Sequence, residues 1–252
     1  MNRSYTFKKN NSMKKLSVLF AAIVLSAMAA TAQNKVGEFS FKPMIGINLS
    51  DITTNEEVTY KTKYGFAEGL EAEYGVKPWL GISLGAIYSQ QGAWYKASAM
   101  GEGVNEAGHP VVTMLAIDGR LKADYINLPL MANVYLFKGL ALKTGLQVGF
   151  NVHDKLSYSA YYAELLDFRN QDTFIIDFSN NGNSSLIWTE GTVSDVCKTV
   201  DFGIPVGISY EYKNITLDAR YYFGLTNMND VEDSEVMHNR VLSITLGYKF
   251  KL

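Results

Sequence analysis

The sequence is poor in the residues that many small proteins use for cross-linking or for chemistry, with one cysteine and three histidines in 252 residues. A single Cys197 cannot form an internal disulfide, so no disulfide framework supports the fold. We interpret this thiol as a structural residue near a strand end. No metal-ligand, phosphate-loop or dinucleotide pattern is present.

Three local patterns resemble chemical sites, and each has a simpler explanation. Gly81–Gly85 matches a hydrolase Gly-x-Ser-x-Gly pattern, but it lies inside an alternating strand and not at the sharp turn that this pattern requires. His153-Asp154 lacks a positioned partner and a pocket. The acidic segment 230–235 lacks the spacing and the turn glycine of a calcium loop. We therefore predict no enzyme activity, no catalytic residue, no metal and no cofactor.

Long apolar runs are also missing, except for one near the start. Following Met13 come Lys14-Lys15, an apolar run over Leu16–Ala30, and the small residues Ala30 and Ala32 around Thr31. This is the layout of a secretory signal peptide, and the run is short for a membrane-spanning helix. We expect residues 1–32 to be a cleaved signal peptide, translated from Met13 or Met1, and the mature chain to span 33–252.

Basic residues are scarce in the mature chain. Residues 1–32 hold five of the 23 basic residues and none of the 25 acidic ones, which leaves 18 basic against 25 acidic residues, a formal charge of −7. Phosphate binding along a nucleic acid needs a basic surface. The composition therefore argues against a nucleic-acid partner.

The mature chain does contain repeated alternation of apolar and polar residues with a period of two. Near the C-terminus, one phase reads Leu242, Ile244, Leu246, Tyr248, Phe250 and Leu252, while the other reads Val241, Ser243, Thr245, Gly247 and Lys249. Successive side chains of a strand point to opposite faces. The same pattern predicts eight strands, near residues 39–50, 64–76, 80–89, 125–136, 140–151, 201–211, 215–224 and 240–252. Glu68 is the exception, because it falls in an apolar phase.

Two features distinguish a membrane barrel from a soluble sandwich or a lipocalin-like barrel. The polar phase carries glycine and ionisable groups, and the apolar phase carries aliphatics with aromatics near the strand ends. Short connections at 77–78, 138–139 and 213–214 alternate with long ones at about 51–63, 92–121, 154–198 and 226–239. Both features are typical of outer-membrane proteins. We predict an all-β, eight-stranded antiparallel transmembrane β-barrel in a bacterial outer membrane, surrounded by its lipid, with four extracellular loops and both termini periplasmic.

The polar phase holds charged side chains that would face the lumen. They are Lys42, Glu71, Glu73, Lys143, Asp201, Glu211, Asp218, Arg220 and Lys249. An eight-stranded barrel is only wide enough for side chains, and buried charges persist when they are paired. We expect an ion-pair network that plugs the lumen, with Lys42 near Glu73 and with Asp218 and Arg220 near Lys249.

The third connection is the longest, and its two β-prone runs, Phe174–Phe178 and Leu186–Thr189, flank Asn180–Asn183. This arrangement predicts a hairpin that extends above the membrane. Aromatic residues of the connections could contact a protein or ligand, or pack among themselves. They are Trp94, Tyr158, Tyr161, Tyr162 and Trp188.

Several sequence blocks together resemble the PorT-like outer-membrane β-barrel family, within the OmpX-like and OmpA-like eight-stranded architecture. The blocks are Lys42–Ser50, Gly85–Gly92, Asp124–Leu130, Gly145–Phe150, Asp201–Gly203, Asp218–Thr226 and Asn239–Phe250. The resemblance covers nearly all of the mature chain except the connections. It implies a C-terminal strand that engages the outer-membrane assembly machinery, although here Phe250 is followed by Lys251-Leu252. The family supplies no catalytic residues.

These observations leave four hypotheses of function, in this order. The first is a non-enzymatic barrel that presents loops for binding or envelope integrity. The second is porin-like passage of small solutes, and the third is a component of a protein-secretion system, a role that one member of the family has. The fourth is a membrane-embedded lipid or peptide hydrolase.

Overall fold

The computed structural model describes residues 35–54, 59–104, 110–166, 184–230 and 236–252. The expected signal peptide, residues 1–32, lies outside them. No helix in these ranges is both long and apolar enough to cross a membrane. The strands are β1 (Phe39–Thr53), β2 (Thr59–Lys77), β3 (Leu80–Val104), β4 (Pro110–Phe137), β5 (Leu140–Leu166), β6 (Ser184–Val193), β7 (Val200–Tyr212), β8 (Ile215–Gly224), β9 (His238–Tyr248) and β10 (Phe250–Lys251).

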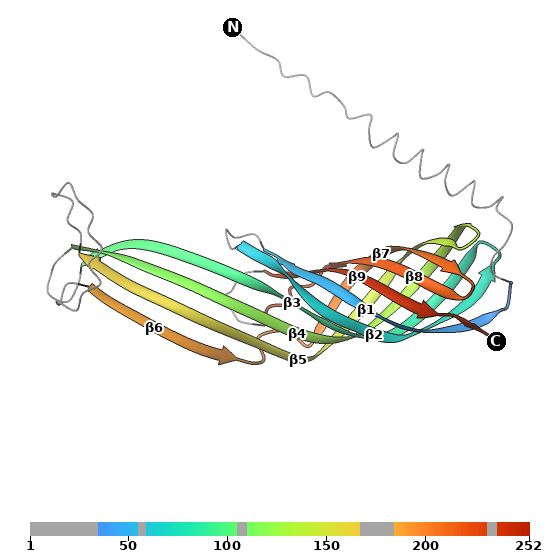
Figure 1. Cartoon of the computed structure of the whole chain (residues 1–252), viewed down its shortest axis with the longest axis horizontal. Coiled ribbons are helices and arrows are strands. Elements are labelled where there is room, and N and C mark those ends of the chain that lie inside the picture. Colours follow the sequence, from blue (N-terminus) through green and yellow to red (C-terminus); the bar gives the residue numbers. More distant parts are fainter. Residues whose placement is uncertain (1–34, 55–58, 105–109, 167–183, 231–235) are drawn as a thin grey trace, which may run out of the picture.

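Eight of these strands form a closed antiparallel ring, as the sequence predicts (Figure 1). Neighbours in the ring are also neighbours in sequence, except that β7 follows β5 directly because β6 lies off the ring. The ring closes where β1 pairs with β9 along Met44–Thr53 and with the short β10 at Ser40 and Phe41. Closure leaves the ring without a free edge, which lipid could not satisfy with hydrogen bonds.

Burial follows the predicted alternation and confirms that the apolar phase faces outward. On β9 and its neighbours, Val241 and Thr245 are buried, whereas Leu246 is 53% exposed. The outward face carries large apolar side chains around the ring, and the inward face carries buried polar ones. Glu68 keeps to the outward phase, opposite Ile45 and Tyr88, and is exposed.

One residue departs from the predicted phase. Leu136 was expected to face lipid, but it is only 8% exposed. The β4–β5 register shifts between Tyr135 and Phe137, beside the turn, and this irregularity changes the orientation of the residue between them.

The short connections are the expected tight turns. Lys213 and Asn214 both have positive φ, 47° and 70°. Two consecutive left-handed residues fit a type I′ hairpin turn, whose twist matches that of the flanking strands. Gly139 has φ 92° in the β4–β5 turn, a conformation that glycine adopts without steric strain.

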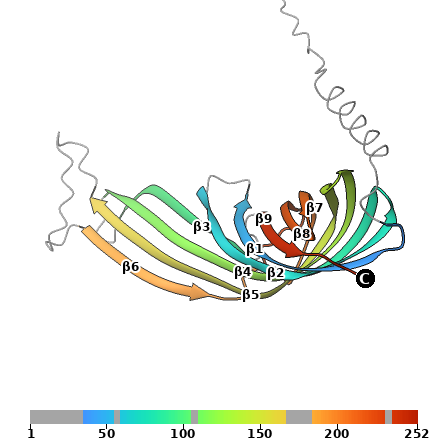
Figure 2. The ribbon, with the colours of Figure 1, turned by 45° about the vertical axis from the view of Figure 1, so that its right-hand side comes forward.

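The long connections differ most from the sequence prediction. Segments 92–121 and 154–198 were expected to be loops, but β3, β4 and β5 continue through much of them, and β6 adds a further strand alongside β5. These four strands form a curved sheet that projects from one end of the ring, which we call the outer extension (Figure 2). Of the predicted hairpin, Phe174–Phe178 lies outside the described residues, and Leu186–Thr189 pairs with Ala160–Ala163 of β5.

Candidate functional site

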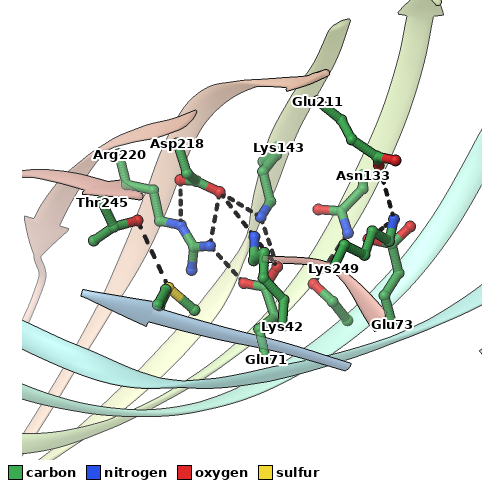
Figure 3. A network of polar contacts seen from close by, with 12 residues as sticks. Lys42, Glu71, Glu73, Asn133, Lys143, Glu211, Asp218, Arg220, Thr245 and Lys249 are labelled. Carbon is green, nitrogen blue, oxygen red and sulfur yellow. Dashed lines mark hydrogen bonds and ion pairs between the residues drawn. The ribbon is translucent and has the colours of Figure 1, made fainter. Parts of the chain in front are cut away.

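Five charged side chains meet in the middle of the lumen, and we call them the central cluster (Figure 3). The Lys143 ammonium lies 2.8 Å from a Glu71 carboxylate oxygen and 2.7 Å from an Asp218 oxygen. Arg220 donates from Nε to Asp218 at 2.8 Å and from Nη2 to Glu71. Lys42 lies 3.0 Å from Glu71 and 3.5 Å from Asp218. Each carboxylate is therefore shared by three cations.

The central cluster joins strands on opposite walls of the ring. Lys42 comes from β1, Glu71 from β2, Lys143 from β5, and Asp218 with Arg220 from β8. Asp218 and Arg220 are two residues apart, so strand geometry places them on the same face. All five side chains are buried. The ion pairs thus connect the walls of the barrel across its interior.

A second group of charges lies nearer the short turns, and we call it the turn-side cluster. Lys249 lies 3.2 Å from Glu73 and 3.6 Å from Glu211, and it donates to the Tyr135 hydroxyl at 3.0 Å. The Tyr135 hydroxyl in turn donates to Glu73. Lys251 pairs with Glu211 at 3.0 Å. This group contains two cations and two carboxylates.

The pairing partners differ from those expected from the sequence. Lys42 was expected near Glu73, but the β1–β2 register sets it opposite Glu71. Lys249 was expected near Asp218 and Arg220. Those two residues lie opposite Thr245 and Ser243 on β9, whereas the Lys249 backbone bonds Asn214 at the turn, close to the turn-side cluster.

Asp201 lies apart from both clusters, near the outer mouth of the ring. It accepts hydrogen bonds from the Thr226 hydroxyl at 2.6 Å and the Asn239 amide at 2.8 Å. Among the described residues it forms no ion pair, so its role in the structure is that of a hydrogen-bond acceptor.

A cluster of apolar residues closes the outer mouth, which the sequence did not predict. Its members include Ile52, Leu121, Tyr125, Cys197 and Met228. Cys197 is a free, buried thiol in this cluster. It lies in the segment between β6 and β7, and the backbone of this segment donates hydrogen bonds to a buried carboxylate.

That carboxylate belongs to Asp154, which accepts backbone hydrogen bonds from Val196 at 2.7 Å and Cys197 at 3.0 Å. Asp154 is buried, while the adjacent His153 is exposed. Neighbouring residues of a strand point to opposite faces, so the two side chains do not form a joint site.

The other candidate residues for catalysis or metal binding also have structural roles or lie outside the described ranges. Ser83, the serine of the hydrolase-like pattern, is buried in β3 and accepts a hydrogen bond from the Asn133 amide at 3.1 Å. His238 contacts the Thr226 carbonyl at 3.0 Å. His109 and most of the acidic segment 230–235 lie outside the described residues.

Two cavities among the described lumen residues are small. A cavity of about 10 Å³ lies among residues that include Lys42, Glu73 and Lys249, and one of about 30 Å³ lies near Met44 and Gln147. A single water needs about 10–15 Å³ measured in this way. Each cavity can therefore hold at most one or two waters.

A much larger cavity lies on the outer extension. It has a volume of about 880 Å³ and is bordered by side chains of β2 to β6. Its lining combines five lysine or arginine residues with three aromatic ones, a composition suited to anionic or aromatic ligands.

Comparison with known proteins adds a family and a set of similar structures. A family model described as "Outer membrane protein beta-barrel domain" matches residues 31–230. No curated protein matches the chain. Similar solved structures include Ail of Yersinia pestis, 18% identical with a TM-score of 0.41, covering 86% of this chain and 100% of Ail. Neisserial surface protein A is 15% identical with a TM-score of 0.38, covering 83% and 97%. OprG of Pseudomonas aeruginosa is 12% identical with a TM-score of 0.29, covering 88% and 98%.

Proposed function

This chain belongs to the outer membrane protein beta-barrel domain family, and from that premise we propose that the barrel is a closed anchor whose outer extension is the binding part. The observation that carries the proposal is the contrast between a lumen filled by paired charges and an ordered outer sheet with a cavity of about 880 Å³. Binding sites are usually concave surfaces on a rigid scaffold. The protein is accordingly proposed to be non-enzymatic.

The closed lumen argues against porin-like passage of solutes. Ions would have to cross both the central cluster, whose five side chains are buried, and the turn-side cluster, in which the buried Lys249 and Glu73 are paired. We expect the purified full chain in planar bilayers to show no stable, large openings. Single-channel recording measures this directly, and a reproducible large conductance from the wild-type monomer would support the porin alternative.

Binding by the outer extension can be tested separately. The aromatic residue Trp94 is 45% exposed in the cavity. Crosslinking on intact cells, with a photoreactive residue in place of Trp94, is expected to capture a partner. The same residue in place of Leu217, on the lipid face of β8, serves as the control. Equal capture from both positions, or from neither, would argue for a purely structural barrel.

The ends of the chain lead to a prediction about export. We propose that residues 1–32 are removed and that both termini are periplasmic, since β1 and β10 pair near the short-turn end of the ring. The intact mass of the envelope form is expected to correspond to residues 33–252. A mass that retains Leu16–Ala30 would contradict cleavage.

Within the family, we propose a PorT-like assignment, supported by the sequence blocks that run from Lys42–Ser50 to Asn239–Phe250. Assembly through the C-terminal strand is supported by the stacking of Phe250 on Phe41, with ring centroids 4.8 Å apart, at the closure of the ring. A role in protein secretion is the second candidate, and co-purification of secretion components after mild crosslinking would favour it.

A further inference from the structure

Basic residues line the cavity on the outer extension. They lie on the side of the sheet that is continuous with the outward face of the ring. Lys61 of β2 and Trp94 of β3 are paired in register, and Trp94 is paired with Arg120 of β4. One step nearer the ring, Lys122 of β4 lies opposite Lys155 of β5. Residues directly opposite in antiparallel strands point to the same face. We call these five residues the basic surface.

The basic surface lies on the same face as the lipid-facing residues of the ring. On β4, Lys122 lies an even number of positions from the exposed Ile126 and Leu128, while Ala123, between them in the other phase, is fully buried. A continuous strand keeps the phase of its side chains. The basic side chains therefore point outward, above the apolar belt, and not into the lumen.

The position of Lys122 along β4 places it just above the apolar belt of the ring, which includes the exposed Ile126 and Leu128. Lys122 lies four positions before Ile126, which is about 13 Å along a strand and about 10 Å along the membrane normal at the usual barrel tilt. The headgroup layer begins where the hydrocarbon ends and is on the order of 5–8 Å deep on each side. Counted from Ile126, the backbone of Lys122 lies just beyond this depth, and the flexible side chains of Lys122 and of its neighbour Lys155 can reach back to lipid phosphates.

Cations outnumber acids around this cavity. Five cations line the cavity but only two acids, Asp118 and Glu190. Asp118 is already paired with Lys96 at 2.8 Å. Lys122 and Lys155, like charges directly opposite one another, repel. In the described part of the chain neither lysine forms an ion pair, although Asp124 lies on the same face of β4, two positions from Lys122.

Arg120 provides a second indication that this surface binds an anion. Its guanidinium carbon lies 4.8 Å from the centroid of the Trp94 ring, which holds the group in a fixed position. Its Nε is buried and has no hydrogen-bond partner among the described residues. A buried donor without a partner is unfavourable, and an anion would satisfy it.

We propose that the basic surface binds the phosphate groups of glycolipid headgroups in the outer leaflet, so that the extension is held against the membrane surface. Lys122 and Lys155 provide the charge nearest the lipid, and Arg120 on Trp94 provides a directed donor farther out. A phosphate between the two lysines removes their mutual repulsion. This proposal holds whether or not the extension also binds a protein partner.

The test is a binding titration of the purified full chain in zwitterionic detergent micelles with fluorescent diphosphoryl lipid A, followed by anisotropy. A lysine near an anionic surface contributes about fivefold to affinity. Lys122→Gln with Lys155→Gln is therefore expected to weaken binding about 25-fold. Lys96→Gln is the matched control, because Lys96 lies on the same face but farther out and is paired with Asp118; it should stay within about twofold of wild type.

Two further ligands distinguish the sources of the anion. Lipid A without phosphates is expected to bind weakly and equally to all variants. Dextran sulfate serves as a soluble polyanion. The proposal is overturned if the double variant binds diphosphoryl lipid A as well as wild type does, if removal of the phosphates changes nothing, or if only dextran sulfate depends on the two lysines. Heat-dependent gel mobility confirms that each variant is folded.

Discussion

Replacing Glu71 with alanine is expected to lower the unfolding free energy of the barrel by about 3–5 kcal/mol. Glu71 is 2% exposed and is the shared partner of Lys42, Lys143 and Arg220. Without it, three buried cations have Asp218 alone as their carboxylate in the central cluster. Uncompensated buried charge is among the most destabilising changes that a single substitution can make.

Glu68→Ala is the matched control, because it removes the same residue type from the same strand but from the outward face. It is expected to be neutral or slightly stabilising, since Glu68 is exposed and faces the apolar surroundings of the ring. Glu71→Gln keeps the hydrogen-bonding capacity but not the charge. Its unfolding free energy is expected to lie between those of Glu71→Ala and Glu68→Ala. Urea unfolding of the full chain in lipid vesicles measures all three. Equal stability of Glu71→Ala and Glu68→Ala would contradict a network that stabilises the barrel.

Arginine in place of Ile208 is expected to destabilise the barrel by about 2–4 kcal/mol. Ile208 lies on β7 and is 45% exposed on the outward face. An arginine at this position would place its charged guanidinium in hydrocarbon, and this transfer costs free energy. Tyr212→Arg, at the turn end of the same strand, is the control, and near the interface the penalty falls to about 0–1 kcal/mol. If Tyr212→Arg lowered the unfolding free energy in vesicles more than Ile208→Arg does, the centre of the membrane would lie nearer Tyr212 than Ile208.

The orientation of β7 can be checked without measuring stability. Ile208 and Ser209 are neighbours that point to opposite faces. A polar, membrane-impermeant thiol reagent is expected to spare Ile208→Cys in the membrane-embedded protein. Labelling of Ile208→Cys together with protection of Ser209→Cys would mean that the two faces had been exchanged.

The local pattern of the sequence was enough to determine the class of fold. Alternation with a period of two is a property of neighbouring residues, so it assigned Leu246 to the outside and Asp218 to the inside without any knowledge of the partner strands. Turn residues such as Lys213-Asn214 marked where strands reverse. The same reasoning placed Glu68 on the apolar face, where the structure also has it.

The strand lengths beyond the ring were not visible in the sequence. Segments such as Ala93–Val104 contain small and polar residues whose alternation is weak. They become strands because β3, β4 and β5 supply one another with backbone hydrogen bonds over their full lengths. That support depends on partners far along the chain, and so does the union of Lys61, Arg120, Lys122 and Lys155 on one surface.

The choice of ion-pair partners was likewise decided by the tertiary structure. The sequence assigns Lys42 and Lys249 to the inner face, but only the register of the paired strands determines that Lys42 meets Glu71 and that Lys249 meets Glu73. Register and ring closure fix how far each strand is shifted against its neighbours. A shift of two residues preserves every alternation in the sequence and changes every contact across the lumen, which is why the faces could be predicted and the partners could not.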